Sequence, residues 1–177
     1  MSIVKKILKV LAAIIILLLI AAIFVGKEYA VERAIIINKP TSAVFNYVKF
    51  LKNQDYYSKW ALMDPNMKKS FSGVDSTVGC ISAWDSENKD LGKGEQEIKK
   101  ITEGSRIDYE LRFEKPMKDV ADSYMTTEAA GADKTTVKWG IKGRMTYPFN
   151  LMGLFMDKMM GGDLEEGLAN LKRIQEK

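Results

Sequence analysis

The sequence contains no histidine and only one cysteine, Cys80. Histidine is the side chain best suited to acid–base catalysis near neutral pH and the commonest metal ligand, so its absence argues against zinc sites and serine-triad chemistry. A single cysteine cannot form an internal disulfide, and the domain must therefore be stabilised by its core. No basic partner that would activate Cys80 is evident, so we interpret it as an inert buried thiol. We predict no metal site, no cofactor and no catalytic residue.

An excess of one charge is also missing from most of the chain. The net charge is +4, from 27 basic and 23 acidic residues, but Lys5, Lys6 and Lys9 cluster near the N-terminus. Without these three lysines, 24 basic residues remain against the 23 acidic ones, and the rest of the chain is nearly neutral. Nucleic-acid-binding domains carry a concentrated basic surface. The composition therefore predicts no nucleic-acid partner.

One long apolar run lies near the N-terminus. Every residue in the range 10–25 is apolar. Residues 7–26 offer about 19 to 20 helical positions, or roughly 30 Å, which is enough to span a bilayer. Lys9 would extend its ammonium group to the lipid headgroups, as long basic side chains do near helix ends. We expect residues 1–26 to form a transmembrane anchor that contacts the membrane through residues 7–26, and residues 27–177 to form one domain.

A cleaved secretory signal is the alternative, because a lysine-rich start before an apolar stretch fits both. The residues after the run do not form a clean cleavage site, since the small residue Ala30 has Glu28 two positions before it. We therefore favour the uncleaved anchor. The positive-inside rule places the lysine-rich N-terminus in the cytoplasm. The expected location is the cytoplasmic (inner) membrane, with a single pass and the domain in the periplasm or outside the cell.

The domain begins with a strand and a short helix. Residues 31–37 are rich in β-branched side chains and precede Pro40, which indicates a strand followed by a helix with proline at its first position. An apolar stripe at helical spacing then faces a core and includes Val44, Phe45 and Val48. A second short helical piece follows it.

Short strands separated by turn residues follow in the range 69–144. In residues 106–114, apolar side chains alternate with charged ones, and residues 135–145 repeat this pattern. A two-residue alternation indicates strands with one buried and one solvated face. Because no helical period is sustained here, we expect an antiparallel sheet.

Two pairs of carboxylates in this region each share one strand face. Asp108 and Glu110 lie opposite the apolar set of their strand, and we assign them to the solvated face. For Glu95 and Glu97 the neighbouring residues leave the direction open. If this pair points into a cavity, burial would raise a carboxyl pKa, and the group would serve as an acid or as a ligand anchor.

The apolar period becomes helical again after Pro148. Leu164 and Leu168 belong to a stripe that faces a core, with charged residues opposite. The first half of this segment is rich in methionine. Gly161-Gly162 separates it from the second half, for which Asp163 is the expected cap.

The expected order of elements is a strand, two small helices, about six antiparallel strands and one long C-terminal helix. The helix must cover the apolar face of the sheet, so we expect an α+β fold in which a curved antiparallel sheet wraps around that helix, preceded by one transmembrane helix. Several short patterns support one family: Asn38-Lys39-Pro40, the stretch Trp60 to Pro65, Val78-Gly79 before Trp84, Gly92-Lys93-Gly94-Glu95, Val137-Lys138-Trp139 and Gly167-Leu168-Ala169-Asn170-Leu171-Lys172. With them, residues 30–175 resemble the START-like helix-grip superfamily, also called the SRPBCC or polyketide cyclase/dehydrase family.

The resemblance implies a fold more than a function. The superfamily includes lipid and sterol carriers, hormone receptors, aromatase/cyclases and co-chaperones, and no shared catalytic residue carries over to this chain. A transmembrane segment departs from many soluble members and argues against free shuttling in the cytoplasm.

Aromatic and methionine side chains on the expected inner surfaces are the candidate ligand contacts. They are Trp60, Trp84, Tyr109, Phe113, Met125, Trp139, Phe155, Met156 and Met159. The competing interpretation is that each of them is simply part of the core. The flexible, polarisable methionine side chain suits an adaptable apolar chamber, which favours binding.

We infer a membrane-anchored binding module that holds a hydrophobic small molecule or a lipid between the sheet and the C-terminal helix. Two alternatives stay open. The first is a cyclase/dehydrase-type enzyme for an apolar substrate, which the lack of histidine weakens. The second is a co-chaperone-like interaction domain, which exposed apolar patches would favour. The sequence identifies no protein partner.

Overall fold

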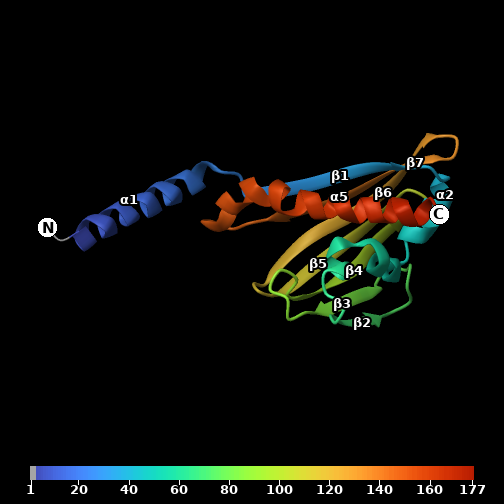
Figure 1. Ribbon diagram of the computed structural model, residues 1–177, viewed down its shortest axis with the longest axis horizontal. Helices are drawn as coiled ribbons and strands as arrows, with labels where there is room; N and C mark the ends of the chain where they lie inside the picture. The colour runs from blue at the N-terminus through green and yellow to red at the C-terminus, as the bar shows by residue number, and fades with distance from the viewer. Residues whose placement is uncertain (1–2) are drawn as a thin grey trace.

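The structure is a computed structural model that describes residues 3–177 (Figure 1). The apolar helix α1 projects from a domain in which a sheet wraps around the long helix α5. The helical elements are α1 (Ile3–Phe24), α2 (Thr41–Val48), η1 (Leu51–Asn53), α3 (Gln54–Tyr57), α4 (Lys59–Leu62), η2 (Phe149–Phe155) and α5 (Met156–Gln175). The strands are β1 (Glu28–Ile37), β2 (Lys68–Ser72), β3 (Ile81–Asp85), β4 (Lys93–Thr102), β5 (Arg106–Lys115), β6 (Asp119–Gly131) and β7 (Lys134–Arg144).

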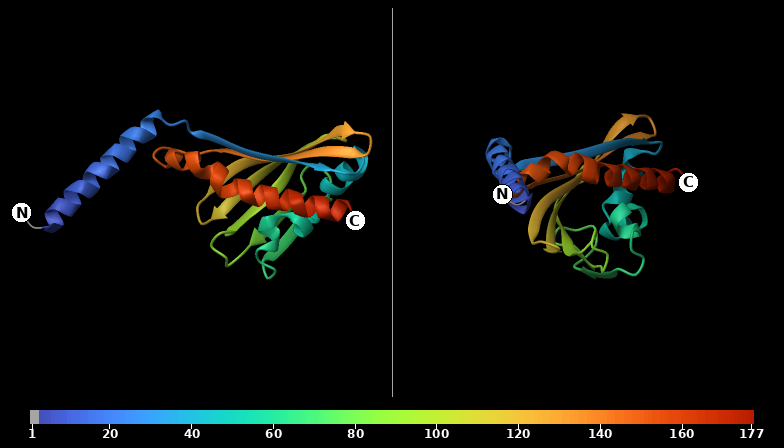
Figure 2. Two further views of the ribbon diagram at one scale, coloured as in Figure 1. Left: turned by 45° about the horizontal axis from the view of Figure 1, so that its top comes forward. Right: turned by 60° about the vertical axis from the view of Figure 1, so that its left-hand side comes forward.

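The strands of the described chain form one seven-stranded antiparallel sheet in the order β1-β7-β6-β5-β4-β3-β2. The sheet is curved, and α5 lies on its concave side (Figure 2). On β5, Ile107, Tyr109 and Leu111 are buried at the concave face, whereas Asp108 and Glu110 are only half-buried and lie on the convex face. The expected antiparallel sheet and the solvated position of this carboxylate pair are confirmed.

The two ends of the sheet have different neighbours. The strand registers place the start of β1, the end of β7 and the β5–β6 connection at one end. Lys93 pairs with Asp85 on β3 and with Lys115 on β5, so the β3–β4 connection lies there too. We call this the proximal end because α1 leads directly into it (Figure 1). The β2–β3 connection lies at the opposite, distal end.

Helix α5 covers one side of the concave face of the sheet. Its leucine stripe is confirmed, because Leu164, Leu168 and Leu171 are at most 1% exposed. Helix α5 packs mainly along β1 and also contacts β7, α3 and α4. The concave surface of β3, β4 and β5 therefore lies beside α5 rather than beneath it.

The short helices after β1 close part of the remaining space. Val44, Phe45 and Val48 of α2 are buried as the stripe predicted, and Tyr57 of α3 is fully buried against α5 and the sheet. Helix α2 begins at Thr41, so Pro40 precedes the helix instead of occupying its first position.

The expected break in the C-terminal helix is absent from the structure. Helix α5 runs without interruption from Met156 to Gln175, and Asp163 lies inside it rather than at a cap. The residues before it form the 3-10 helix η2. Gly161 has a packing role, because a Cβ there would overlap the guanidinium group of Arg33 on β1. That guanidinium binds Asp157 at 2.7 Å, so the glycine allows the helix and the strand to approach each other.

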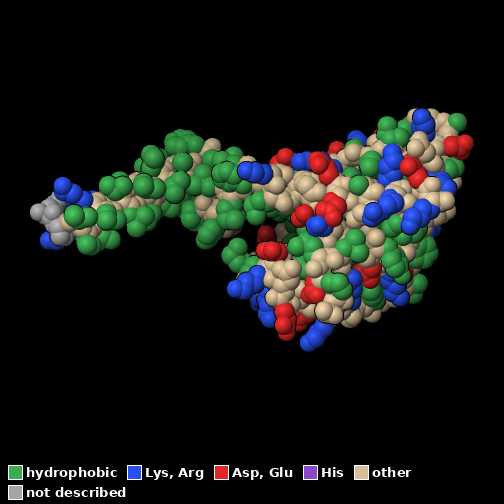
Figure 3. Space-filling view, in the orientation of Figure 1, with side chains coloured by type: hydrophobic (Ala, Val, Ile, Leu, Met, Phe, Trp, Pro, Cys, Tyr) green, Lys and Arg blue, Asp and Glu red, His purple; other side chains and the backbone are tan. Residues whose placement is uncertain are grey.

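Among the helices of residues 3–177, α1 is the one that is long and apolar enough to cross a membrane. A signal sequence near the N-terminus would meet the same criterion of length and composition. Its side chains are exposed except Leu19, which is half-buried, and Ala22, which is buried where α1 meets the domain. Figure 3 shows these apolar side chains as a continuous green surface outside the charged surface of the domain.

Two glycines of α5 provide a matched test of this packing. The Gly162→Ala variant should stabilise the domain by about 0.5–1 kcal/mol, because alanine favours the helix and nothing lies within 4 Å of its Cβ. The Gly167→Ala variant should instead destabilise it by about 1–3 kcal/mol, since its Cβ would lie 2.8 Å from Trp139 Cζ3. Denaturant unfolding measures both changes. Equal effects of the two substitutions would contradict the tight contact between α5 and Trp139.

Candidate functional site

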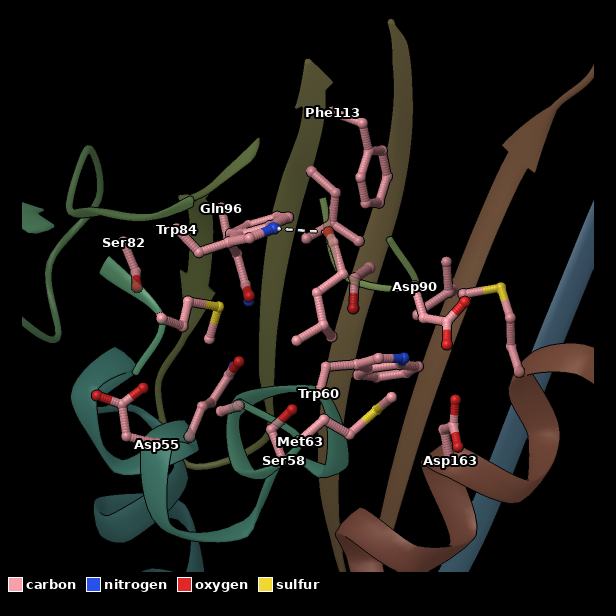
Figure 4. A pocket seen from close by; sticks show the side chains of 18 of the residues that line it. Asp55, Ser58, Trp60, Met63, Ser82, Trp84, Asp90, Gln96, Phe113 and Asp163 are labelled. Atoms are coloured by element: carbon pink, nitrogen blue, oxygen red, sulfur yellow. Dashed lines mark hydrogen bonds between the residues drawn. The ribbon is translucent and has the colours of Figure 1, made fainter. Parts of the chain in front are cut away.

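A cavity of about 620 Å³ lies between the sheet, the α3–α4 segment and the first turns of α5 (Figure 4). Its floor is the concave surface of the sheet from β3 to β7, because side chains of all five of these strands line it. Most of its wall is apolar: Leu51, Trp60, Ala61, Met63, Met67, Ala83, Trp84, Leu91, Leu111, Phe113, Pro116, Trp139, Ile141, Met159 and Met160. At the proximal end the wall comes from the β3–β4 connection, the β5–β6 connection and α5.

All three tryptophans of the chain line this cavity. Trp60 and Trp139 meet edge to face, with ring centroids 5.7 Å apart. Trp84 meets Phe113 in the same manner at 5.9 Å, and its indole N–H donates to the Leu91 carbonyl oxygen at 3.1 Å. Edge-to-face aromatic pairs fix the orientation of their rings. The cavity therefore has rigid aromatic walls, and the indole N–H groups of Trp84 and Trp139 are already bonded within the protein.

Five of the nine candidate ligand residues line the cavity: Trp60, Trp84, Phe113, Trp139 and Met159. Figure 4 shows Trp60, Trp84 and Phe113 together on its walls. Contact of these residues with a ligand stays a prediction.

The other four candidates lie outside the cavity wall. Tyr109, Met125 and Met156 are buried in the core, and Phe155 is 58% exposed on η2. The Tyr57 hydroxyl contacts the Met125 sulfur at 3.4 Å, so α3 covers this part of the sheet. Burial raises the pKa of Tyr109 well above its usual range, which keeps this phenol protonated.

Polar cavity residues were not among the candidates, and Gln54 is the most informative of them. Its side chain is only 8% exposed and lies beside the Tyr109 hydroxyl, yet neither its Nε2 nor that hydroxyl forms a hydrogen bond of good geometry within residues 3–177. Gln96 on β4 also lines the cavity (Figure 4). A signal existed in the sequence, because Gln54 is three residues from both Leu51 and Tyr57 and so continues a buried helical stripe.

Glu95 and Glu97 point away from the cavity. Arg112 binds Glu95 and Glu97 at 2.6 Å each and also contacts Glu110, on the convex face. Hydrogen bonds from Arg112 and Lys99 hold the pKa of Glu97 below its usual value. The possibility of a buried carboxylate acid at this pair is therefore wrong, since its charged form is stabilised at the surface.

Charged residues at the cavity margin are few and partly paired. Asp55 and Lys69 form an ion pair at 2.9 Å, and Asp90 and Asp163 lie near the first turns of α5 and the β3–β4 connection (Figure 4). In the described range 3–177, no group of three or more histidine, cysteine or acidic side chains is placed to hold a metal ion.

Cys80 lies outside the cavity wall and is 1% exposed. Burial and the neighbouring Asp75 carboxylate raise the pKa of its thiol. A raised pKa disfavours the reactive thiolate, so the prediction of a buried thiol is confirmed and the geometry agrees with its inertness.

Several solved structures share this fold at low sequence identity. A norcoclaurine synthase from Thalictrum flavum, in complex with dopamine and hydroxybenzaldehyde, has a TM-score of 0.66 at 8% identity and covers 85% of this chain and 88% of its own. A protein from Helicobacter pylori has a TM-score of 0.62 at 10% identity, with 82% and 87% covered. A protein from Nitrosospira multiformis has a TM-score of 0.56 at 16% identity, with 81% and 94% covered. These similarities establish the fold alone.

Sequence comparison assigns the family. No curated protein matches the chain significantly. The profile of the family described as "Polyketide cyclase / dehydrase and lipid transport" matches residues 29–176. This match covers the whole domain, from β1 to the end of α5. The expected START-like fold is confirmed, and the chain belongs to the polyketide cyclase/dehydrase and lipid transport family.

Proposed function

We propose that the protein is a membrane-anchored binding module that holds a hydrophobic small molecule or a lipid in the cavity beside α5. The observation that carries the proposal is the cavity of about 620 Å³ with every tryptophan of the chain in its wall. Small-molecule sites commonly enclose about 300–1,000 Å³ and are lined by apolar and aromatic side chains. The family description, which includes lipid transport, supports the same class of ligand.

The polar groups of the cavity narrow the chemistry of the ligand. The Gln54 amide is buried without a partner, and an unpartnered buried polar group costs about 1–3 kcal/mol. A rotation of the Gln54 side chain, which lines the cavity, would expose this donor to an acceptor oxygen on a ligand. We therefore assign the cavity to an apolar molecule that carries at least one oxygen, such as a lipid with a hydroxyl or carbonyl group.

The junction between α1 and the domain supports an anchor that remains part of the mature protein. The Asn150 amide donates to the carbonyl oxygens of Ala22 at 2.7 Å and Val25 at 2.8 Å. The Tyr147 hydroxyl donates to the Leu19 carbonyl oxygen at 3.3 Å. The bond to Ala22 satisfies a carbonyl in the last turn of α1, which has no further helical turn to pair it. Cleavage before β1 would remove all of these contacts.

The cavity is tested by tryptophan fluorescence of the full-length protein in detergent. A brominated fatty acid should quench the emission saturably, because bromine quenches only at short range and all three tryptophans line the cavity. The unbrominated fatty acid should compete and restore the emission. If quenching rises linearly and is not competed, the ligand-binding proposal fails.

Two truncations serve as the matched controls of this experiment. Met159→Ala should alter the fatty acid affinity and cost only about 1 kcal/mol, because this side chain is half-exposed at the cavity wall. Leu168→Ala should leave the affinity unchanged and cost about 2–5 kcal/mol, because it opens a hole in a packed interface. Equal destabilisation by both, without quenching in the wild type, would mean that no open chamber exists.

The Gln54→Leu variant tests the polar contact. It should stabilise the domain by about 1 kcal/mol, because it removes an unpartnered buried amide. The same change should weaken the binding of a brominated fatty alcohol more than that of the matching bromoalkane, which has no oxygen. Gln175→Leu, at the end of α5 and outside the cavity, is the control. Equal weakening of both ligands would contradict the proposed hydrogen bond.

The anchor is tested by intact-mass measurement of membrane-extracted protein and by protease protection. The mass should include the anchor, residues 1–26. External protease should digest the domain in spheroplasts, because the lysines before the apolar run favour a cytoplasmic N-terminus. A mature N-terminus near Lys27 would show a cleaved signal instead. A domain protected from external protease would contradict the orientation.

A further inference from the structure

Large apolar side chains gather on η2 and the first turn of α5, next to the cavity. We call them the η2 patch: Phe149, Met152, Leu154, Phe155 and Met159, which are between 42% and 65% exposed. A soluble domain seldom exposes so many large apolar residues within one short segment, and such patches mark interaction surfaces. In Figure 3 the green surface of α1 continues onto this end of the domain, beside a blue lysine or arginine side chain.

The η2 patch is held beside the end of α1. Asn150, which lies within η2 and is 1% exposed, donates its amide hydrogens to the carbonyls of Ala22 and Val25. Ala22 is buried by this contact, whereas the other described residues of α1 are largely exposed. The apolar patch and the last turn of the apolar helix therefore lie at one level along the axis of α1.

The length of α1 sets the depth of that level. Its 22 residues extend for about 33 Å, close to the roughly 30 Å thickness of the hydrocarbon core. With α1 across the bilayer, its C-terminal end lies at the outer interface rather than far beyond it. A patch bonded to this end must lie in the same interfacial layer.

We propose that the η2 patch inserts into the outer interface of the bilayer and forms a second membrane contact, which turns the proximal end of the cavity toward the lipid. The inference rests on the anchor of the proposed function. Interfacial segments of this kind bury apolar side chains at the boundary between headgroups and acyl chains. The η2 patch would thus bind the lipid of the same bilayer that α1 crosses.

The cavity wall is continuous with this surface. Met159 belongs both to the η2 patch and to the cavity wall, and Pro116 of the β5–β6 connection lines the cavity at the same proximal end. Next to Pro116, Met117 is 64% exposed. Lys115 and Lys118 flank this connection and would face lipid phosphates. An apolar molecule would then pass between bilayer and cavity along apolar side chains instead of through water.

The experiment places a fluorophore on the patch of the full-length protein in phosphatidylcholine/phosphatidylglycerol vesicles. The Leu154→Cys variant is labelled with an environment-sensitive nitrobenzoxadiazole, and Val74→Cys, 72% exposed in the distal β2–β3 connection, is the control. Cys80 is buried and should not react. Spin-labelled lipids should quench the label at 154 severalfold more strongly than the label at 74.

The outcomes separate this inference from the proposals on which it rests. If the protein floats with the vesicles but the label at 154 is quenched no more than that at 74, the inference is overturned and the anchor stands. If the protein does not float with the vesicles, the anchor and the inference both fall. Failure of fatty acid quenching in detergent would instead contradict the cavity alone.

A second pair of variants tests the route of the ligand. Leu154→Glu should slow the transfer of brominated fatty acid from vesicles to the tryptophans severalfold, because a charge at the patch opposes insertion. The affinity of the Leu154→Glu variant for the brominated fatty acid in detergent should not change, because Leu154 lies outside the cavity wall. Val74→Glu should change neither quantity. Unchanged transfer in Leu154→Glu would overturn the proposed entry from the membrane.

Discussion

The width of the concave sheet face relative to one helix is the constraint on which the remaining structure depends. Helix α5 packs mainly along β1, at one edge of the seven-stranded sheet, and its leucine stripe is buried. A helix has a diameter of only about 10–12 Å with its side chains, whereas neighbouring strands are about 4.8 Å apart. The strands at the other edge therefore need another cover, which α3 and α4 supply in part. The cavity is the space that these short helices leave.

The fold could be predicted from the sequence because the patterns that indicate it are local. Alternation in β5 and β7 and the stripes of α2 and α5 show which side of each element is apolar, and burying those sides leaves few arrangements of one sheet and one long helix. Gly161 and Gly162 of α5 misled the prediction for the opposite reason. The role of Gly161 depends on Arg33, a residue far away in the sequence, and no local pattern reveals such a contact.

The residues of the site could be predicted from the sequence only in part, for a related reason. Tyr109 and Phe113 lie on the same face of β5, yet Tyr109 is covered near Tyr57 and Gln54 of α3 while Phe113 borders the cavity. Alternation identifies the face of a strand but not how far along it a neighbouring helix reaches. The direction of Glu95 was likewise decided by Arg112 on the adjacent strand, through a pairing register that the sequence does not state.

The short connection between α1 and β1 limits how the domain can work. Only Val25, Gly26 and Lys27 separate the helix from the sheet, a span of about 10 Å even when fully extended, and Asn150 holds part of it against η2. With α1 in the bilayer, such a tether leaves the domain almost no reach and little freedom to rotate. Under the proposed function, the domain would therefore stay at one membrane. Any molecule that receives the ligand from it would have to come to that membrane.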